Sequence, residues 1–134
     1  MTHMELPRPL RGVIPAMITP LLGRDELDAA GLERLIDNLL HAGVHGLFPL
    51  GTTGDAPAIR CRLREELIER TCRQVAGRVP VIVGITDTAF AESVRLAEHS
   101  AKCGAQAVVA SAPYYFPAAQ EELLHRRFSR RPLR

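Results

Sequence analysis

Two glycines and two threonines in the middle of the chain form a loop that could bind an anion. The apolar run 44–50 is followed directly by Gly51, Thr52, Thr53 and Gly54, with Asp55 behind them. Glycines let successive backbone N–H groups turn toward one ligand, and such clusters bind carboxylate or phosphate. The threonine hydroxyls add donors and a group that can relay protons. No Gly-Lys-Ser/Thr follows, which excludes a Walker A loop. The alternative is a tight turn whose threonines satisfy its own backbone.

Two tyrosines follow a later apolar run, and they are the only tyrosines in the chain. Tyr114 and Tyr115 lie between Pro113 and Pro117, after the run 107–110. A phenol at the end of a strand can relay protons or pack over a substrate. The same position also suits aromatic side chains that only cover the rim of the fold.

Other reactive side chains are few. Lys102 is the single lysine among 17 basic residues. Any reaction of this chain that requires a lysine would therefore have to use Lys102. The chain has three cysteines, Cys61, Cys72 and Cys103. Their odd number and the lack of a C-x-x-C pair argue against a disulfide framework and a zinc site. We expect all three to be small buried or half-buried apolar residues.

Two histidines have a spacing that could hold a metal on a helix. His41 and His45 are four residues apart, but Gly43 between them is typical of a helix end. We therefore interpret them as ordinary histidines, and we expect neither a metal nor a cofactor.

Composition limits the class of protein. The 134 residues are 46% apolar and 24% charged, which is typical of one globular domain. The net charge of +2 is too small to indicate nucleic acid, and five of the arginines fall in the last nine residues. No apolar run approaches a membrane span, and the N-terminus lacks the pattern of a secretory signal. We expect a cytoplasmic location, with no nucleic-acid or membrane partner.

Apolar runs rich in β-branched residues alternate with segments of helical period. The runs cover 13–18, 44–50, 79–85 and 107–110. Apolar stripes predict one helix between Asp28 and Gly43, a second from near Arg60 to Gly77, a third from Asp87 or Thr88 to Gly104, and a fourth opening near Gln120. Asp28 is a suitable N-cap for the first helix, and Asp87 or Thr88 for the third. Gly43, Gly77 and Gly104 are suitable residues behind the helix ends.

This alternation predicts an α/β fold with parallel strands. The repeat of about 30 residues would build a (βα)8 barrel from eight units, and this chain holds four. Half of a TIM barrel and a small open doubly wound sheet both remain possible. In either architecture ligands lie at the carboxyl ends of the strands, where the loops with Thr19, Gly51–Gly54, Thr86 and Ser111 follow.

Four motifs taken in order resemble the dihydrodipicolinate synthase / N-acetylneuraminate lyase family. They are V-I-P-A-M-I-T-P, P-L-G-T-T-G-D, V-P-V-I-V-G and S-A-P-Y-Y-F-P-A-A-Q-E-E-L, and the resemblance covers about 11–128. It implies that 11–128 is the N-terminal half of a TIM-barrel lyase domain. Residues 1–10 would be a loose lead-in and 129–134 a basic tail outside the family pattern.

The resemblance also implies an activity and roles for single residues. Family members are class I aldolases or lyases that act on pyruvate or other 2-oxo acids through a lysine Schiff base, usually as dimers of dimers. Gly51, Thr52, Thr53 and Gly54 would bind the substrate carboxylate, with Thr53 holding it through its backbone N–H. Thr52 and Tyr115 would relay protons. The P-Y-Y-F variant slightly favours a sugar-acid or other 2-oxo acid aldolase over an enzyme of lysine biosynthesis.

The chain departs from the family pattern in several places. The Schiff-base lysine falls beyond the last residue, and Lys102 is expected to be a solvated cation at a helix end. Asp55 stands where the family usually has Glu, and the second helix, starting near Arg60, lacks a capping residue. The S-R-R-P-L-R ending is typical of out-of-frame translation or truncation, with a genuine basic tail as the alternative.

These departures leave two functions open. The first is the N-terminal half of a Schiff-base lyase that is inactive alone. The second is a non-catalytic half barrel that binds a 2-oxo acid carboxylate or pairs with a full-length paralogue. A nucleic-acid role for the arginine tail ranks third, because no folded basic face accompanies it. A half barrel would also expose two strand edges, so we expect self-association.

Overall fold

The computed structural model describes residues 6–112, and they form a partial α/β fragment. Three α-helices alternate with extended segments, and two 3-10 helices follow the second of these segments. In chain order the elements are α1 (Ala29–His41), η1 (Thr52–Gly54), η2 (Ala56–Ala58), α2 (Cys61–Val75), β1 (Ile82–Gly84), α3 (Phe90–Lys102) and β2 (Ala107–Val109). The helix expected near Gln120 and the tail 129–134 lie outside the described residues, so a half barrel of four βα units is not established.

Extended segments pair in parallel in their order along the chain. β1 pairs with β2 in the register Ile82–Ala107. The predicted strands 13–18 and 44–50 do not form regular strands, and this prediction is corrected: single parallel bridges join Ala16 to Phe48 and Leu47 to Val81. The reason is proline, which lacks an N–H and interrupts the ladder. Prolines occur in or beside these segments, at positions 15, 49 and 80.

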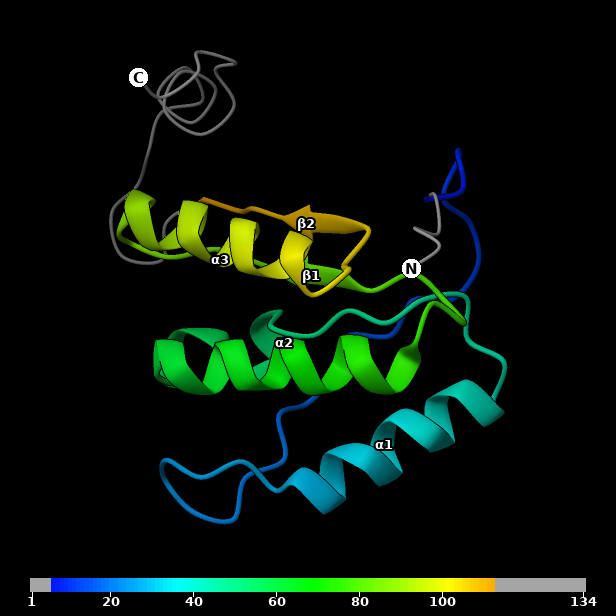
Figure 1. Cartoon of the computed structure of the whole chain (residues 1–134), viewed down its shortest axis with the longest axis horizontal. Helices are drawn as coiled ribbons and strands as arrows, with labels where there is room; N and C mark the ends of the chain where they lie inside the picture. The colour runs from blue at the N-terminus through cyan, green and yellow to red at the C-terminus, as the bar shows by residue number, and fades with distance from the viewer. Residues whose placement is uncertain (1–5, 113–134) are drawn as a thin grey trace.

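Three helices cover these extended segments. Figure 1 shows α2 between α1 and α3, with β1 and β2 beside α3. The core is supplied by helices and extended segments together. The largest fully buried side chains include Leu32, Ile36, Leu63, Leu67 and Ile68 from α1 and α2, and Leu47, Val81 and Val83 from the extended segments. No helix within 6–112 combines the length and apolar character needed to cross a membrane.

Helix ends test the predicted caps. Asp28 is the N-cap of α1, as predicted, and its Oδ1 accepts a hydrogen bond from the Gly31 N–H at 2.8 Å. α2 begins after Arg60 without a side-chain cap, also as predicted. The predicted caps of α3 are wrong: Ala89 is its N-cap and gives no side-chain bond. Asp87, three residues before the helix begins, instead accepts a hydrogen bond from the Ala89 N–H at 2.9 Å.

The cysteines have the burial predicted for them, and one histidine bonds to the backbone. Cys72 is buried, Cys61 and Cys103 are half-buried, and all three are free. Burial, with a smaller contribution from Cys103, raises the pKa of the Cys72 thiol to about 12, so this thiol stays protonated and unreactive. His45 Nδ1 accepts from the Val13 N–H at 3.1 Å. Within 6–112 no group of three or more His, Cys, Asp or Glu side chains is arranged to hold a metal.

One buried hydroxyl in α2 gives a stability prediction. Thr71 is fully buried, and its Oγ1 has no hydrogen-bond partner among the described residues. Replacing that hydroxyl with a methyl group removes an unsatisfied polar atom at constant shape, so Thr71→Val should raise the free energy of unfolding by about 1 kcal/mol. Urea unfolding followed by circular dichroism measures the change.

Thr71→Ser is the matched control, because it keeps the hydroxyl and deletes the methyl group. It should lower the free energy of unfolding by about 1 kcal/mol. A Thr71→Val protein no more stable than the Thr71→Ser protein would show that the hydroxyl is satisfied in solution.

Candidate functional site

The G-T-T-G loop lies directly behind the segment 44–50 and forms the short helix η1. Gly51 and Gly54 are buried, whereas the threonines between them are exposed. Leu50 and Asp55 flank the loop with left-handed φ values of 61° and 51°. This conformation is costly for leucine and easier for aspartate, whose short side chain tolerates it. Strain of this kind is held by the surrounding structure and is concentrated at functional sites.

Backbone hydrogen bonds hold the loop without using its threonine side chains. The Gly54 N–H donates to Gly51 O at 3.0 Å, and the Asp55 N–H donates to Thr52 O at 3.1 Å. Within 6–112, neither the hydroxyls nor the backbone N–H groups of Thr52 and Thr53 have a hydrogen-bond partner. The threonine side chains therefore do not satisfy the turn, and four donors of these two exposed residues are left without a partner among the described residues.

Thr19 connects this loop to the end of the first extended segment. Its Oγ1 donates to Gly54 O at 2.6 Å. Gly54 must be small here, because a Cβ at that position would lie 2.8 Å from Met17 O. The sequence placed Thr19 in a loop facing the site but did not predict this bond. The signal was a hydroxyl residue directly behind an apolar run.

A pair of hydroxyl side chains connects the segments that follow β1 and β2. Thr86 Oγ1 and Ser111 Oγ lie 3.0 Å apart, and the Ser111 N–H donates to Thr86 Oγ1 at 2.9 Å. The carboxyl ends of neighbouring parallel strands meet at one edge of a sheet. Hydroxyl side chains thus join the loops in pairs at this edge.

The remaining predicted residues are not brought to this loop by the described structure. Tyr115 and its neighbour Tyr114 lie outside the described residues, so the predicted proton relay stays a prediction. Lys102 is the last residue of α3 and is exposed, as predicted. It precedes the start of β2, whereas the G-T-T-G loop follows the end of an extended segment. Lys102 therefore lies at the amino-terminal edge of the strands, opposite the edge that carries the G-T-T-G loop.

A buried ion pair fixes the loop behind β1, and sequence reasoning missed it. Arg64 Nη1 lies 2.7 Å from Asp87 Oδ2, with side chains that are 9% and 14% exposed. Arg64 Nε also donates to Ile59 O at 3.1 Å, so one side chain connects the segment behind the G-T-T-G loop to the loop behind β1. The signal was an arginine inside the apolar stripe of α2.

Electrostatics at Asp87 favour the charged form. Burial acts to raise the pKa of this carboxyl, but the hydrogen bonds from the Ala89 N–H and Arg64, together with the charge of Arg64, lower it below its ordinary value. The Asp87 carboxylate is therefore charged at neutral pH.

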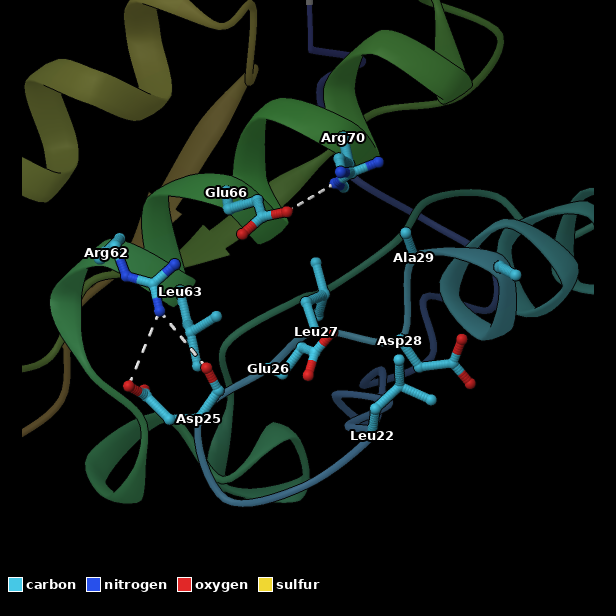
Figure 2. Close-up of a pocket in the computed structure, with 11 residues that line it drawn as sticks. Leu22, Asp25, Glu26, Leu27, Asp28, Ala29, Arg62, Leu63, Glu66 and Arg70 are labelled. Atoms are coloured by element: carbon cyan, nitrogen blue, oxygen red, sulfur yellow. Dashed lines mark hydrogen bonds and ion pairs between the residues drawn. The ribbon is translucent and has the colours of Figure 1, made fainter.

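A groove of about 570 Å³ lies away from the G-T-T-G loop, between α2 and the segment 22–30. Figure 2 shows that its arginines face carboxylates of the same groove. Arg62 lies 3.7 Å from Asp25 Oδ2, and Arg70 lies 2.9 Å from Glu66 Oε1. None of the predicted site residues lines this groove. Its lining holds four acidic side chains and only two arginines, so the groove is negative overall and does not compete with the loop as a binding site for an anion.

The Arg64–Asp87 pair predicts a loss of stability with a defined pH dependence. Asp87→Asn leaves Arg64 buried without a counter-charge and should cost about 3 kcal/mol at pH 7. Because the pKa of Asp87 is lowered by folding, this contribution is present above the unfolded pKa of about 3.9 and is lost as the pH falls through the folded pKa. Urea unfolding of both proteins from pH 7 to pH 3 measures it.

Asp25→Asn is the matched control, because Asp25 pairs with Arg60 and Arg62 at the surface. It should change the free energy of unfolding by less than about 1 kcal/mol. An Asp87→Asn effect equal to the control, or one that grows on acidification, would contradict the role given to the pair.

Comparison with known proteins reveals relatives a little more than twice as long, and this chain spans about 38% of their length. The chain is 39% identical over 113 residues to 4-hydroxy-tetrahydrodipicolinate synthase of Gluconacetobacter diazotrophicus. These aligned residues make up 84% of this chain and 38% of that protein. Its structure is similar to dihydrodipicolinate synthase from Bacteroides thetaiotaomicron, with a TM-score of 0.83 and 52% identity over 87% of this chain and 39% of the other.

A further similar structure was solved with a ligand. It is YagE, a prophage protein of the dihydrodipicolinic acid synthase family from E. coli K12, in complex with pyruvate. The TM-score is 0.82 at 33% identity, over 86% of this chain and 39% of YagE. The structural relatives are TIM-barrel proteins, of which this chain spans about 39%. The model of the dihydrodipicolinate synthetase family matches residues 9–127, and the chain belongs to this family of lyases.

Proposed function

We propose that this chain holds the carboxylate-binding part of a Schiff-base lyase site, with pyruvate or another 2-oxo acid as its ligand. The observation that carries the proposal is the set of donors on Thr52 and Thr53, which are exposed and unused by the turn. Backbone N–H groups directed at one point bind anions well, because they need no reorganisation when the ligand arrives. The pyruvate complex of YagE supports this choice of ligand.

The loop assigns different roles to its two threonines in this proposal. Thr53 holds the carboxylate through its N–H and hydroxyl, while Gly51 and Gly54 keep the backbone close to the ligand. Thr52 passes protons through its hydroxyl, together with Tyr115. The bond from Thr19 to Gly54 keeps the loop in place while the ligand binds.

Carbon–carbon chemistry in such a site needs an electron sink, which the family resemblance assigns to a lysine imine. Lys102 is exposed at the end of α3 and lies at the opposite ends of the strands. We therefore propose that the 134-residue chain has no aldolase or lyase turnover by itself. We further propose that it corresponds to four βα units of an eight-unit barrel, which the parallel order of its extended segments supports.

A second candidate function is pairing through the two edges of the fragment. Val13 is 63% exposed on the first extended segment, and Val108 is 44% exposed on β2. Ile18 and Phe90 add apolar surface near these edges. Exposed edges with apolar side chains recruit further strands, so a second copy or a longer relative could cover them.

The first prediction from this proposal concerns binding without covalent chemistry. Because this chain supplies only the carboxylate-binding part of the proposed site, pyruvate should bind weakly. We expect a Kd of about 1 mM in a calorimetric titration. Thr53→Val removes one donor and should weaken binding about tenfold, whereas Thr52→Val should leave the Kd almost unchanged. Borohydride added with pyruvate should attach nothing to the protein, as read by mass spectrometry.

Three outcomes would contradict it. Binding could be absent, it could be insensitive to Thr53→Val, or turnover could occur. Turnover is checked in a coupled assay with pyruvate and candidate aldehydes, and Lys102→Ala is the matched variant. Activity or a borohydride adduct that disappears in Lys102→Ala would show that Lys102 acts as the imine-forming lysine.

The exposed edges predict self-association. Sedimentation velocity should show dimers or larger species, and Val108→Lys should lower their fraction because a charge on an edge opposes strand pairing. Arg34→Lys is the control, because it keeps the positive charge on α1 and changes no strand edge. It should leave the fraction of dimers unchanged. A monodisperse monomer that melts cooperatively would contradict pairing as a function of this chain.

A further inference from the structure

Gly84 is the last residue of β1, and the carbonyl of Leu50 occupies the space where a side chain would be. A Cβ on Gly84 would overlap the Leu50 carbonyl oxygen, and it would lie 2.6 Å from the Leu50 carbonyl carbon and 3.3 Å from Gly51 N. The obstacle is backbone, which cannot move aside as the end of a flexible side chain can. Any residue larger than glycine must therefore displace the peptide that leads into the G-T-T-G loop.

That peptide is already held in an uncommon conformation. Leu50 has a φ of 61° and is only 2% exposed, so the core fixes its side chain while its backbone is left-handed. Gly84 also bonds to the peptide that precedes Leu50, because the Gly84 N–H donates to Pro49 O at 3.0 Å. Gly84 thus contacts two successive peptides, one by a hydrogen bond and one by close packing.

The direction of the Leu50–Gly51 peptide determines where the next residues go. Gly51 begins the turn that is closed by the Gly54 N–H on Gly51 O and the Asp55 N–H on Thr52 O. A rotation at Leu50 would displace the Thr52 and Thr53 donors and weaken both closing bonds. The strained backbone at Leu50 fits because Gly84, which packs against the Leu50 carbonyl, has no side chain.

We propose that Gly84 is a positioning residue for the G-T-T-G loop. It acts through the Leu50–Gly51 peptide and does not touch the ligand. The part of this inference that concerns binding rests on the proposed function, whereas the part that concerns loop geometry does not. Sequence reasoning placed Gly84 at the end of a buried strand without giving it a role.

The test compares two buried glycines of neighbouring segments. Gly84→Ala should speed hydrogen exchange of the Gly54 and Asp55 amides about tenfold, because their closing bonds open more often. It should also weaken pyruvate binding about tenfold or more, since a small misplacement of donors is costly. Gly46→Ala is the matched control: its Cβ would lie 3.1 Å from Pro80 O, away from the loop, and it should change neither quantity by more than about twofold.

A second variant keeps the test decisive if Gly84→Ala does not fold. Leu50→Ile conserves core volume, but a β-branched residue strongly resists a left-handed φ. With Gly84 intact, it should speed exchange of the same two amides and weaken binding in the same way. Circular dichroism decides which variants are folded.

Each outcome has one meaning. Wild-type exchange in folded Gly84→Ala and in Leu50→Ile would overturn the inference, as would equal effects in Gly46→Ala and Gly84→Ala. A wild-type chain that binds no pyruvate contradicts the proposed function. The exchange rates of the Gly54 and Asp55 amides still decide the role of Gly84 in that case.

Discussion

Parallel backbone pairing between the extended segments is the constraint on which the rest of the structure depends. The Met17 N–H bonds to Phe48 O at 2.9 Å, Leu47 bonds to Pro80 O at 2.9 Å, and β1 continues the order to β2. Prolines reduce two of these pairings to single bridges, but the order survives. It brings the loops with Thr19, Gly51–Gly54, Thr86 and Ser111 to one edge, where their hydroxyls join neighbouring loops.

Two further contacts determine how precisely the G-T-T-G loop is held. Arg64 reaches from α2 to Asp87 behind β1, and it also bonds to Ile59 O just behind the loop. Gly84 leaves room for the Leu50 carbonyl at the start of the loop. The loop is therefore restrained at its entry by packing and beyond its exit by charge. Both restraints leave the exposed threonines free for a ligand.

Features that depend on neighbouring residues were predictable from the sequence. Asp28 caps α1, and Gly43 follows its end with a φ of 74°, as the local pattern indicates. The family resemblance was also correct, because G-T-T-G and the motifs around it form a specific combination. The glycines of the loop also have packing reasons: a Cβ on Gly54 would meet Met17 O, and one on Gly51 would meet the Phe48 ring.

Features that depend on distant partners were not predictable. Asp87 or Thr88 was expected to cap α3, but the Asp87 carboxylate is held by Arg64, which is 23 residues away in the chain. Arg64 itself lies in an apolar stripe, and nothing local shows that its charge is neutralised. The extended segments 13–18 and 44–50 had the composition of strands, yet the positions of their prolines relative to the neighbouring segments decided how many ladder bonds could form.

The central claim is that the donors of Thr52 and Thr53 form a carboxylate site that works without an imine. Titration of ¹⁵N-labelled protein with pyruvate, followed through backbone amide chemical shifts, tests it most directly. The account predicts saturable shifts that are largest at the Thr52 and Thr53 amides, smaller at Gly54, and absent in the groove around Asp25 and Arg62. Shifts that centre on that groove or on Lys102, or no saturable shift in the G-T-T-G loop, would contradict it.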